Sequence, residues 1–250
     1  MTGSLWKTVY DDLRTRITTG QLHPGDQVPP ELKLATQYQV SRQTARRALS
    51  QLQQEGLITP GRGSRGRTVR YHRPLRWQLS RFEAGVRRDD TGIGMDEWAA
   101  EVAEQGRTPR QTVQASIQSS NEEVSEALQI PEGGLVVCRE RIRYVDGVPY
   151  QLSRSYFPES IGAGTVLMQQ GDVVMPGGIL KSIGHPQHHA RDEITVRMPT
   201  PDEVDQLHLT NGTPVGVHTR TGYGKDGNPV RYMNTVFPGD KHYLVYELDL

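Results

Sequence analysis

An internal repeat in the second half of the chain constrains the fold more than any other feature. Residues 123–158 (EVSEALQIPEGGLVVCRERIRYVDGVPYQLSRSYFP) resemble residues 203–238 (EVDQLHLTNGTPVGVHTRTGYGKDGNPVRYMNTVFP) at an offset of 80. Each copy follows a strand-like segment and predicts a helix, a strand, an Asp-Gly turn and a returning strand. Two such units predict one α+β domain on an antiparallel sheet with internal duplication. The identical pairs are Glu123 and Glu203, Val124 and Val204, Val137 and Val217, Asp146 and Asp226, Gly147 and Gly227, Pro149 and Pro229, Phe157 and Phe237, and Pro158 and Pro238.

The formal net charge of zero conceals an uneven distribution of charged residues. Residues 1–75 contain 12 Lys and Arg against 5 Asp and Glu, whereas residues 76–250 contain 17 against 24. A chain of 250 residues is expected to form two domains. A basic segment joined to an acidic one predicts an N-terminal polyanion-binding domain, called the head below, followed by a domain with a different function.

Cysteine usage and hydropathy bear on the compartment. Cys138 is the only cysteine, which excludes an intramolecular disulfide and fits a reducing environment. No apolar run approaches the roughly 20 residues that span a bilayer, and the N-terminal segment lacks the apolar centre of a secretory signal. We therefore expect a cytoplasmic protein without a membrane partner.

The first seventy residues predict three helices followed by a hairpin. Apolar spacing predicts a helix over residues 5–18, and a short second helix is expected to begin around Glu31, after Pro30. Ser41 is a suitable N-cap for a third helix with an apolar stripe. Two strand-like segments then flank the loop PGRGSRG. The stripe consists of Ala45, Ala48, Leu49 and Leu52.

The other side of the third helix carries groups suited to double-stranded DNA. A helix, a turn and a capped basic helix form a helix-turn-helix arrangement, whose second helix fits the major groove. Arg and Gln can pair with guanine and adenine, and arginines of the hairpin, as a wing, can reach phosphates or the minor groove. The alternative is a solvated helix with a flexible basic loop. The outward residues are Gln43, Arg46, Arg47 and Ser50, flanked by Arg42 and Thr44.

Residues 5–70 resemble the winged helix-turn-helix domain of GntR-family transcription regulators. The resemblance rests on the motifs GQLHPGDQVP, SRQTARRAL and EGLI, which occur in the family's order and spacing. Pro30 and Leu32 stand where the family often has Ser and Arg, and the wing loop is one residue longer than the common form. The DNA contacts that the resemblance implies are Ser41, Arg42, Thr44, Arg46, Arg62 and Gly63, to which position on the same surfaces adds Gln43, Arg47 and Arg65.

Residues 95–248 resemble the UTRA effector domain of the HutC-type branch of that family. The resemblance rests on RIR followed by DG-x-P and SYFP, and on the later GNPVRY and FPGDKHY. It implies a chorismate lyase-like fold, a small molecule bound between the repeats, and a dimer formed by this domain.

The candidate effector site begins with Arg141 and Arg143, which are expected on the same face of one strand. Two neighbouring guanidiniums on an inner face require an anion to offset their repulsion and desolvation. Ser153 and Ser155 share a face of the returning strand and are expected to complete this anion site. The alternative is that this face of the strand is exposed to solvent and the arginines pair with nearby acidic residues. In the resembled family, R-x-R and the later serine position contribute to effector binding.

The second copy offers further candidates for the same cleft. Tyr223, Tyr232 and Asn234 occupy hairpin positions that could line it, although such tyrosines more often pack on a sheet face. The segment HPQHHARDE invites a metal interpretation, but adjacent histidines diverge and no cysteine lies nearby. We expect a solvated loop there, with no metal site and no cofactor.

These observations predict a winged helix-turn-helix domain over residues 1–72, a linker over 73–94 and an effector-binding and dimerisation domain over 95–250. We expect a repressor whose affinity for a two-fold-symmetric operator responds to a small anionic effector, with the linker as transmitter. Two alternatives remain open: an effector-independent regulator whose second domain only dimerises, and an enzyme of lyase-like fold. Since no nucleophile–base motif stands out, we do not expect an enzyme.

Overall fold

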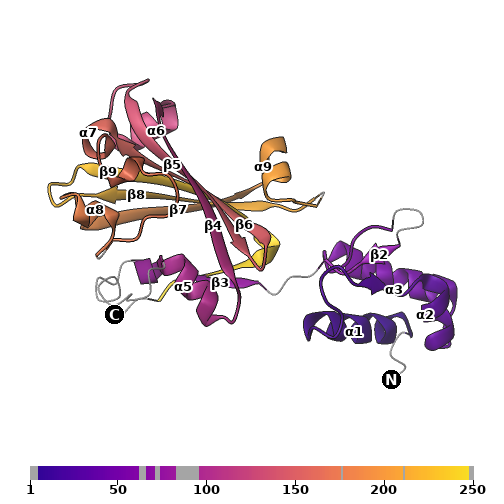
Figure 1. Ribbon diagram of the computed structural model, residues 1–250. Helices are drawn as coiled ribbons and strands as arrows, with labels where there is room; N and C mark the ends of the chain where they lie inside the picture. The colour runs from indigo at the N-terminus through magenta and orange to yellow at the C-terminus, as the bar shows by residue number, and fades with distance from the viewer. Residues whose placement is uncertain are drawn as a thin grey trace. The chain divides into compact units, whose positions relative to one another are not determined.

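The chain forms two compact units, residues 1–73 and 74–250 (Figure 1). The predicted head ends close to this boundary. Residues 74–82 belong to the second unit, so the linker predicted over 73–94 begins as part of that unit. The computed structural model describes residues 5–61, 66–70, 74–82, 96–175, 177–210 and 212–247.

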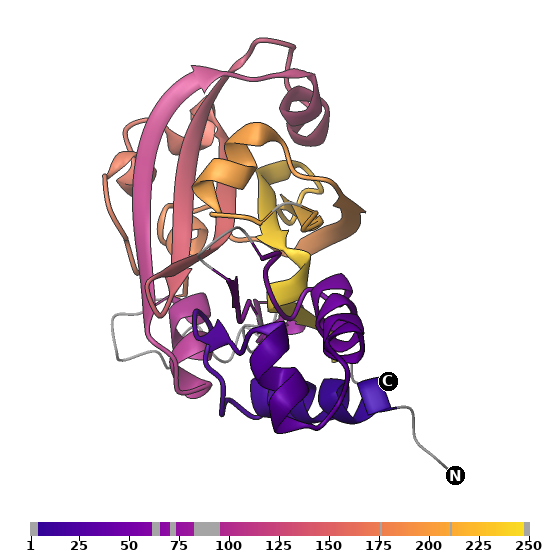
Figure 2. The same cartoon turned by 90° about the vertical axis from the view of Figure 1, so that its right-hand side faces the viewer.

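Three helices make up most of the first unit: α1 (Leu5–Thr18), α2 (Glu31–Gln37) and α3 (Arg42–Gln54). Their apolar stripes pack together as predicted, and the helices appear in Figure 2 in indigo to purple. Ser41 caps α3, because its Oγ accepts a hydrogen bond from the backbone N–H of Thr44 at 3.0 Å. The core includes Val9, Leu13, Ile17, Leu34, Ala45, Ala48, Leu49 and Leu52.

A hairpin follows α3, as predicted. Strand β2 (Arg67–Thr68) pairs antiparallel with β1 (Gln27–Val28), and the backbone N–H of Thr59 donates to the carbonyl of Thr68 at 2.8 Å. Ile58 and Val69 form a further antiparallel bridge. These contacts bring together the two segments that flank PGRGSRG.

A six-stranded antiparallel sheet in the order β4-β5-β6-β9-β8-β7 forms the second unit (Figure 1). Strands β6 and β9 pair at its centre, so the two repeats meet in the middle of one sheet. The predicted duplication and antiparallel α+β fold are confirmed. The first repeat supplies β4 (Pro109–Ser119), β5 (Leu135–Val145) and β6 (Val148–Pro158), and the second supplies β7 (His189–Arg197), β8 (Val215–Tyr223) and β9 (Pro229–Pro238).

Short helices flank the sheet on both faces: α6 (Glu122–Leu128), α7 (Glu159–Gly162), the 3-10 helix η3 (Val166–Met168), α8 (Ile179–Ser182) and α9 (Pro201–Gln206). α6 and the end of α9 pack on the face carrying Leu152 and Tyr232, which we call the helix face. The segment from α7 to α8 packs on the opposite face, against Val137 and Phe157. Figure 2 shows the two groups of helices on opposite sides of the strands. We call the second face the pocket face.

A second, two-stranded pair anchors the start of this unit. Its members are β3 (Leu75–Gln78) and β10 (His242–Val245), which run parallel. The remaining elements of the unit are α5 (Glu97–Glu104) and the 3-10 helices η2 (Leu79–Phe82) and η4 (Gly239–Lys241). Trp77 of β3 is buried against Phe237 and His242. Burial lowers the pKa of His242 to about 3, so its ring packs there uncharged. This strand of the predicted linker is therefore fixed in the second unit.

Candidate functional site

The start and outer face of α3 present the predicted DNA-binding side chains to solvent. Arg42, Gln43, Arg46 and Arg47 are exposed, and Thr44 is half-buried beside the capping Ser41. Some of these side chains line a shallow groove with Trp6 of α1. The Arg47 guanidinium lies 4.6 Å from the centroid of the Trp6 ring, a cation–π contact that ties it to α1. Sequence periodicity gave no sign of this contact.

The predicted wing residues Arg62, Gly63 and Arg65 lie outside the described residues. Arg67, just after them, is described, and its Nη2 lies 3.5 Å from Oε1 of Glu31. Of the predicted DNA contacts, the structure therefore positions those on and beside α3.

Three arginines of β5 alternate along the pocket face, and the outer two are held by protein groups. Arg139, which sequence analysis missed, is fully buried and donates to the backbone carbonyls of Leu167 and Gln169 at 2.7 Å and of Gly171 at 2.9 Å. These bonds fix the segment after α7 to the sheet.

Arg143 is held by side chains instead. It donates to Oε1 of Gln151 at 3.1 Å, its Nη2 lies 3.4 Å from Oδ2 of Asp96, and its guanidinium stacks over the ring of Trp98. The pairing of an arginine with a local acid, one of the two alternatives above, therefore applies to Arg143.

Arg141 lies between these two side chains and has no hydrogen bond or ion pair to a described residue. Burial, reinforced by the charges of Arg143 and Arg139, lowers the pKa of Arg141 to about 10. Its guanidinium therefore stays charged at neutral pH. The carboxylates of Asp96 and Asp172 act on this charge from a distance without bonding to it. A partly buried cation with no direct ion pair favours an incoming anion.

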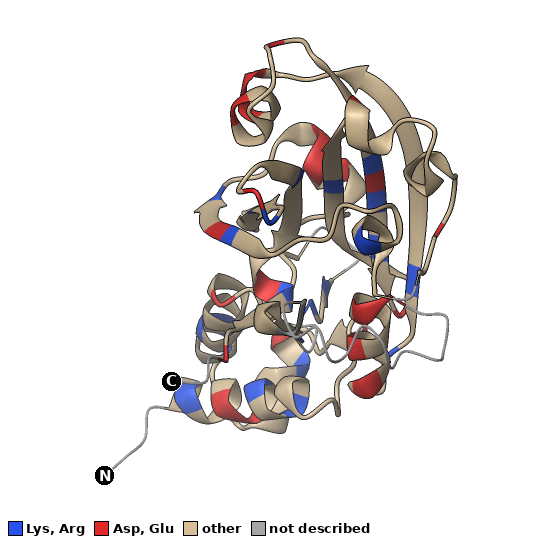
Figure 3. Cartoon of the chain, turned by 90° about the vertical axis from the view of Figure 1, so that its left-hand side faces the viewer, with Lys and Arg blue, Asp and Glu red and all other residues tan. Residues whose placement is uncertain are grey.

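Arg141 and Arg143 line a cavity of about 380 Å³ on the pocket face, within the size range of small-molecule sites. The indole Nε1 atoms of Trp77 and Trp98 are buried in its walls and have no acceptor among the residues described. The lining therefore combines basic, acidic and aromatic side chains. Figure 3 shows basic positions on neighbouring strands of the sheet. Further lining side chains include Asp96, Glu97, Asp172, Lys181, His218, Arg220, Arg231 and Met233.

Strand β8 contributes His218 and Arg220 to the cavity, and both are paired with Asp192 of β7. Oδ1 of Asp192 accepts from Arg220 Nε at 2.6 Å and lies 2.7 Å from His218 Nε2. Although burial opposes ionisation, hydrogen bonds from Arg220, His218 and Tyr246 hold the pKa of Asp192 well below its usual range. Arg220 is therefore neutralised within the protein, in contrast to Arg141.

The two predicted serines lie on the pocket face but do not line the cavity. Ser153 Oγ lies 2.8 Å from Oγ1 of Thr235, and Ser155 Oγ accepts from Arg231 Nη2 at 2.8 Å. Both serines are buried. The expectation that they complete the anion site is corrected, because their hydroxyls are engaged in the packing of the sheet.

The three candidates from the second repeat do not reach the cavity either. Tyr232 and Asn234 pair with Tyr156 and Arg154 and lie on the helix face, where Tyr232 donates to Glu123 of α6. Both align in the repeat with residues that alternate with Ser153 and Ser155, so counting along the strand would have placed them correctly.

The prediction that Tyr223 lines the cavity is wrong for another reason. Its repeat partner is Arg143, but the second hairpin is one residue out of step: Pro149 pairs with Tyr144, whereas Pro229 pairs with Tyr223. A shift of one residue inverts the faces of a strand. Tyr223 consequently stacks with His189 of β7, and His218 and Arg220 face the cavity instead.

The segment HPQHHARDE is only partly a loop, which corrects the prediction. His189 and Asp192 lie within β7, and Asp192 binds Arg220 rather than a metal ligand set. Within the described ranges, no three His, Cys, Asp or Glu side chains converge in a group able to hold a metal ion.

Known proteins share both halves of this architecture. Residues 5–66 match the profile of the bacterial regulatory proteins of the gntR family, and residues 104–243 match that of the UTRA domain. An uncharacterised HTH-type transcriptional regulator of Streptomyces coelicolor is 30% identical over 97% of this chain and 91% of its own length. The HTH-type transcriptional repressor NagR of Bacillus subtilis is 24% identical, with 98% of this chain and 95% of that protein covered.

Solved structures agree. The crystal structure of a GntR-family regulator superposes with a TM-score of 0.60 at 25% identity and covers 98% of both chains. PhnF from Mycobacterium smegmatis shares the fold, with a TM-score of 0.58 at 22% identity, covering 96% of this chain and 99% of that one.

A helix-turn-helix head joined to a domain with a ligand-sized cavity defines the class of effector-responsive DNA-binding regulators. The chain belongs to the GntR family of bacterial regulatory proteins and carries a UTRA domain. It is therefore a DNA-binding transcriptional regulator. In the part of the chain that is described, no helix has both the length and the apolar character of a membrane span.

Proposed function

We propose that this protein is a cytoplasmic repressor that binds a two-fold-symmetric operator as a homodimer and is controlled by an anionic small molecule. The observation that carries the effector part is Arg141, a charged group in the cavity that forms no hydrogen bond or ion pair with a described residue. Two relatives carry repressor in their names: NagR of Bacillus subtilis, and MngR of Escherichia coli, the repressor of a mannosyl-D-glycerate transport/metabolism system. These names support repression as the proposed direction of regulation.

The cavity chemistry indicates a ligand rich in acceptors. A carboxylate or phosphate would accept hydrogen bonds from Arg141, and further oxygens would accept from the indoles of Trp77 and Trp98. Arg143 would add charge while it keeps its contact with Asp96. The role that we propose for the cavity is binding without turnover.

We propose that β3 transmits ligand binding to the head. Along the sequence, β3 begins at Leu75, two residues after the first unit ends, and Trp77 of this strand lines the cavity. A ligand that bonds to Trp77 would therefore act on the strand through which the two units are joined. A ligand changes DNA affinity only by binding the two states unequally. A coupling of about 1–3 kcal/mol would change operator affinity roughly 5- to 150-fold.

Native mass spectrometry of protein purified from its own host tests this function. We expect a retained small molecule with a carboxylate or phosphate group, and addition of that molecule should change mobility-shift affinity for the protein's own operator. Retention of a molecule that leaves DNA affinity unchanged would contradict the proposed regulation.

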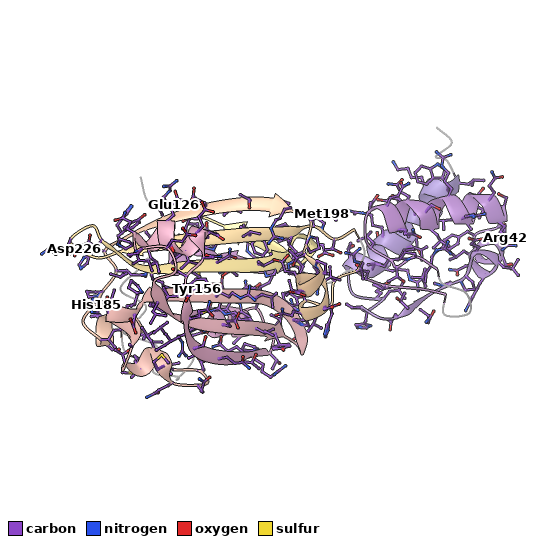
Figure 4. The ribbon with its side chains drawn as sticks, turned by 90° about the horizontal axis from the view of Figure 1, so that it is seen from above. Arg42, Glu126, Tyr156, His185, Met198 and Asp226 are labelled. Atoms are coloured by element: carbon purple, nitrogen blue, oxygen red, sulfur yellow. The ribbon has the colours of Figure 1, made fainter. Side chains whose placement is uncertain are left out.

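The β7 edge of the sheet supports the homodimer. Among the described residues this strand pairs only with β8. It carries the exposed apolar side chains Ile194 and Val196, and the exposed Met198, marked in Figure 4, follows its last residue. An open apolar edge favours pairing with another strand. Antiparallel pairing of two copies about Thr195 would place Glu193 opposite Arg197 of the partner subunit, and Ile194 opposite the partner's Val196.

Val196→Asp is therefore expected to convert the dimer to a monomer at micromolar concentration, because each copy would bring a charge into the apolar pairing. Sedimentation velocity measures the change. Ile117→Asp is the matched control, since Ile117 is an exposed apolar residue on β4 at the opposite edge. A monomer from Ile117→Asp, together with an intact Val196→Asp dimer, would assign the interface to β4 instead.

A further inference from the structure

Three arginines of the head converge on one carboxylate, that of Glu31 at the start of α2. Arg42 Nε donates to Glu31 Oε2 at 3.2 Å, Arg46 Nε lies 4.0 Å from Oε1, and Arg67 Nη2 lies 3.5 Å from Oε1. The Glu31 side chain is only 16% exposed, whereas those of Arg42 and Arg46 are 74% and 72% exposed. One mostly covered acid therefore contacts two exposed cations of α3 and a third from β2.

The contacts engage the inner side of each exposed arginine and leave its outer end open. In the contacts to Arg42 and Arg46, the nitrogen nearest to Glu31 is Nε. The terminal Nη atoms of both have no hydrogen-bond partner among the described residues. Those two nitrogens form the fork that pairs with O6 and N7 of guanine. Figure 4 shows the Arg42 side chain at the periphery of the head.

We propose that Glu31 is a positioning residue for operator recognition: it holds Arg42 and Arg46 with their forks outward and so raises the preference for the operator over other DNA. The inference rests on the proposed DNA contacts of these two arginines. Nothing in it requires Glu31 to touch a base.

Two physical effects of the carboxylate act in the same direction. An arginine held at Nε loses less conformational entropy when its fork pairs with a base. The resulting gain in binding free energy exists only where the correct base is present. Phosphate contacts, in contrast, depend on net charge and are the same for every sequence. A negative charge beside three arginines weakens such contacts on all DNA. Glu31 therefore favours specific binding relative to non-specific binding.

Glu31→Gln in the full-length protein tests the proposal, because it removes the charge and keeps the shape. The probes are a duplex selected by the wild-type protein from a random pool and a duplex of scrambled sequence. We expect the affinity ratio between them to fall about tenfold, equivalent to about 1.4 kcal/mol. Binding to the scrambled duplex should strengthen, and the slope of log K against log salt should steepen by about 0.9, the value for one added phosphate contact.

Glu55→Gln is the charge-matched control. Glu55 is another acid of the head, bonded to Tyr10 and Gln51 and paired with Arg14 at the other end of α3. Its replacement should leave the affinity ratio within about twofold, since it contacts neither Arg42 nor Arg46. An equal loss of preference in both variants would reduce the effect to overall charge and overturn the inference.

Arg42→Lys provides a second route that leaves Glu31 intact. A lysine ammonium cannot bind Glu31 and present a planar fork at the same time, so this variant should also lose preference for the selected duplex. Adding Glu31→Gln to Arg42→Lys should change the affinity ratio much less than Glu31→Gln does in the wild type. If Glu31→Gln keeps the wild-type preference for the selected duplex and its thermal unfolding is unchanged, the inference about Glu31 is overturned and the proposed operator recognition stands. A wild-type protein that selects no sequence would overturn the proposed operator recognition as well.

Discussion

Replacing Arg46 with alanine is expected to weaken operator binding by about 1–3 kcal/mol and to relax preference at one base position. Arg46 is exposed on the outer face of α3, and its nearest ionic partner, Glu31, is 4.0 Å away. The head should therefore keep its stability, because the apolar stripe of α3 is untouched. Titration of operator duplexes with single-base changes measures both effects.

Arg14→Ala is the control for this substitution. Arg14 belongs to the same head and pairs with Glu55 from α1, away from the outer face of α3. Its loss should change operator affinity by less than about 0.5 kcal/mol. If Arg46→Ala weakens binding to every sequence equally and lowers the salt slope by about one, Arg46 contacts a phosphate and not a base.

Arg141→Met is expected to stabilise the ligand-free protein while it abolishes the response to effector. Burial and the adjacent arginines make the charge of Arg141 unfavourable, so an apolar side chain of similar length should raise the free energy of unfolding by about 1–3 kcal/mol. Each kcal/mol corresponds to about 2–4 °C in Tm for a chain of this size. Thermal unfolding of ligand-free protein measures the gain, and loss of effector-dependent mobility shift measures the functional cost.

Arg154→Met separates the effect of the cavity from that of removing any strand arginine. Arg154 lies on the helix face of β6, where it pairs with Glu140, and both side chains are about half exposed. Its replacement should change stability by less than about 1 kcal/mol and leave the effector response intact. A lower Tm in Arg141→Met would mean that Arg141 supports the fold, and would count against the anion site.

The architecture was accessible from the sequence because it depends on local and repeated patterns. Helical periodicity and the Ser41 cap define α1 and α3, since burying an apolar stripe and satisfying a helix end are local requirements. The repeat specified two strand–helix–hairpin units. The alternation of Arg141 and Arg143 placed both at the cavity, because side chains two apart on a strand share a face.

The sequence by itself thus determined the two domains, the helices of the head, the two strand–helix–hairpin units and the strand carrying the candidate anion site. Only the tertiary structure decided which arginine of the cavity forms no direct ion pair. Asp96 and Asp192 reach Arg143 and Arg220 from distant segments, and a hairpin one residue out of step turns His218 toward the cavity in place of Tyr223. Such pairings depend on strand register and long-range contact, which no local pattern encodes.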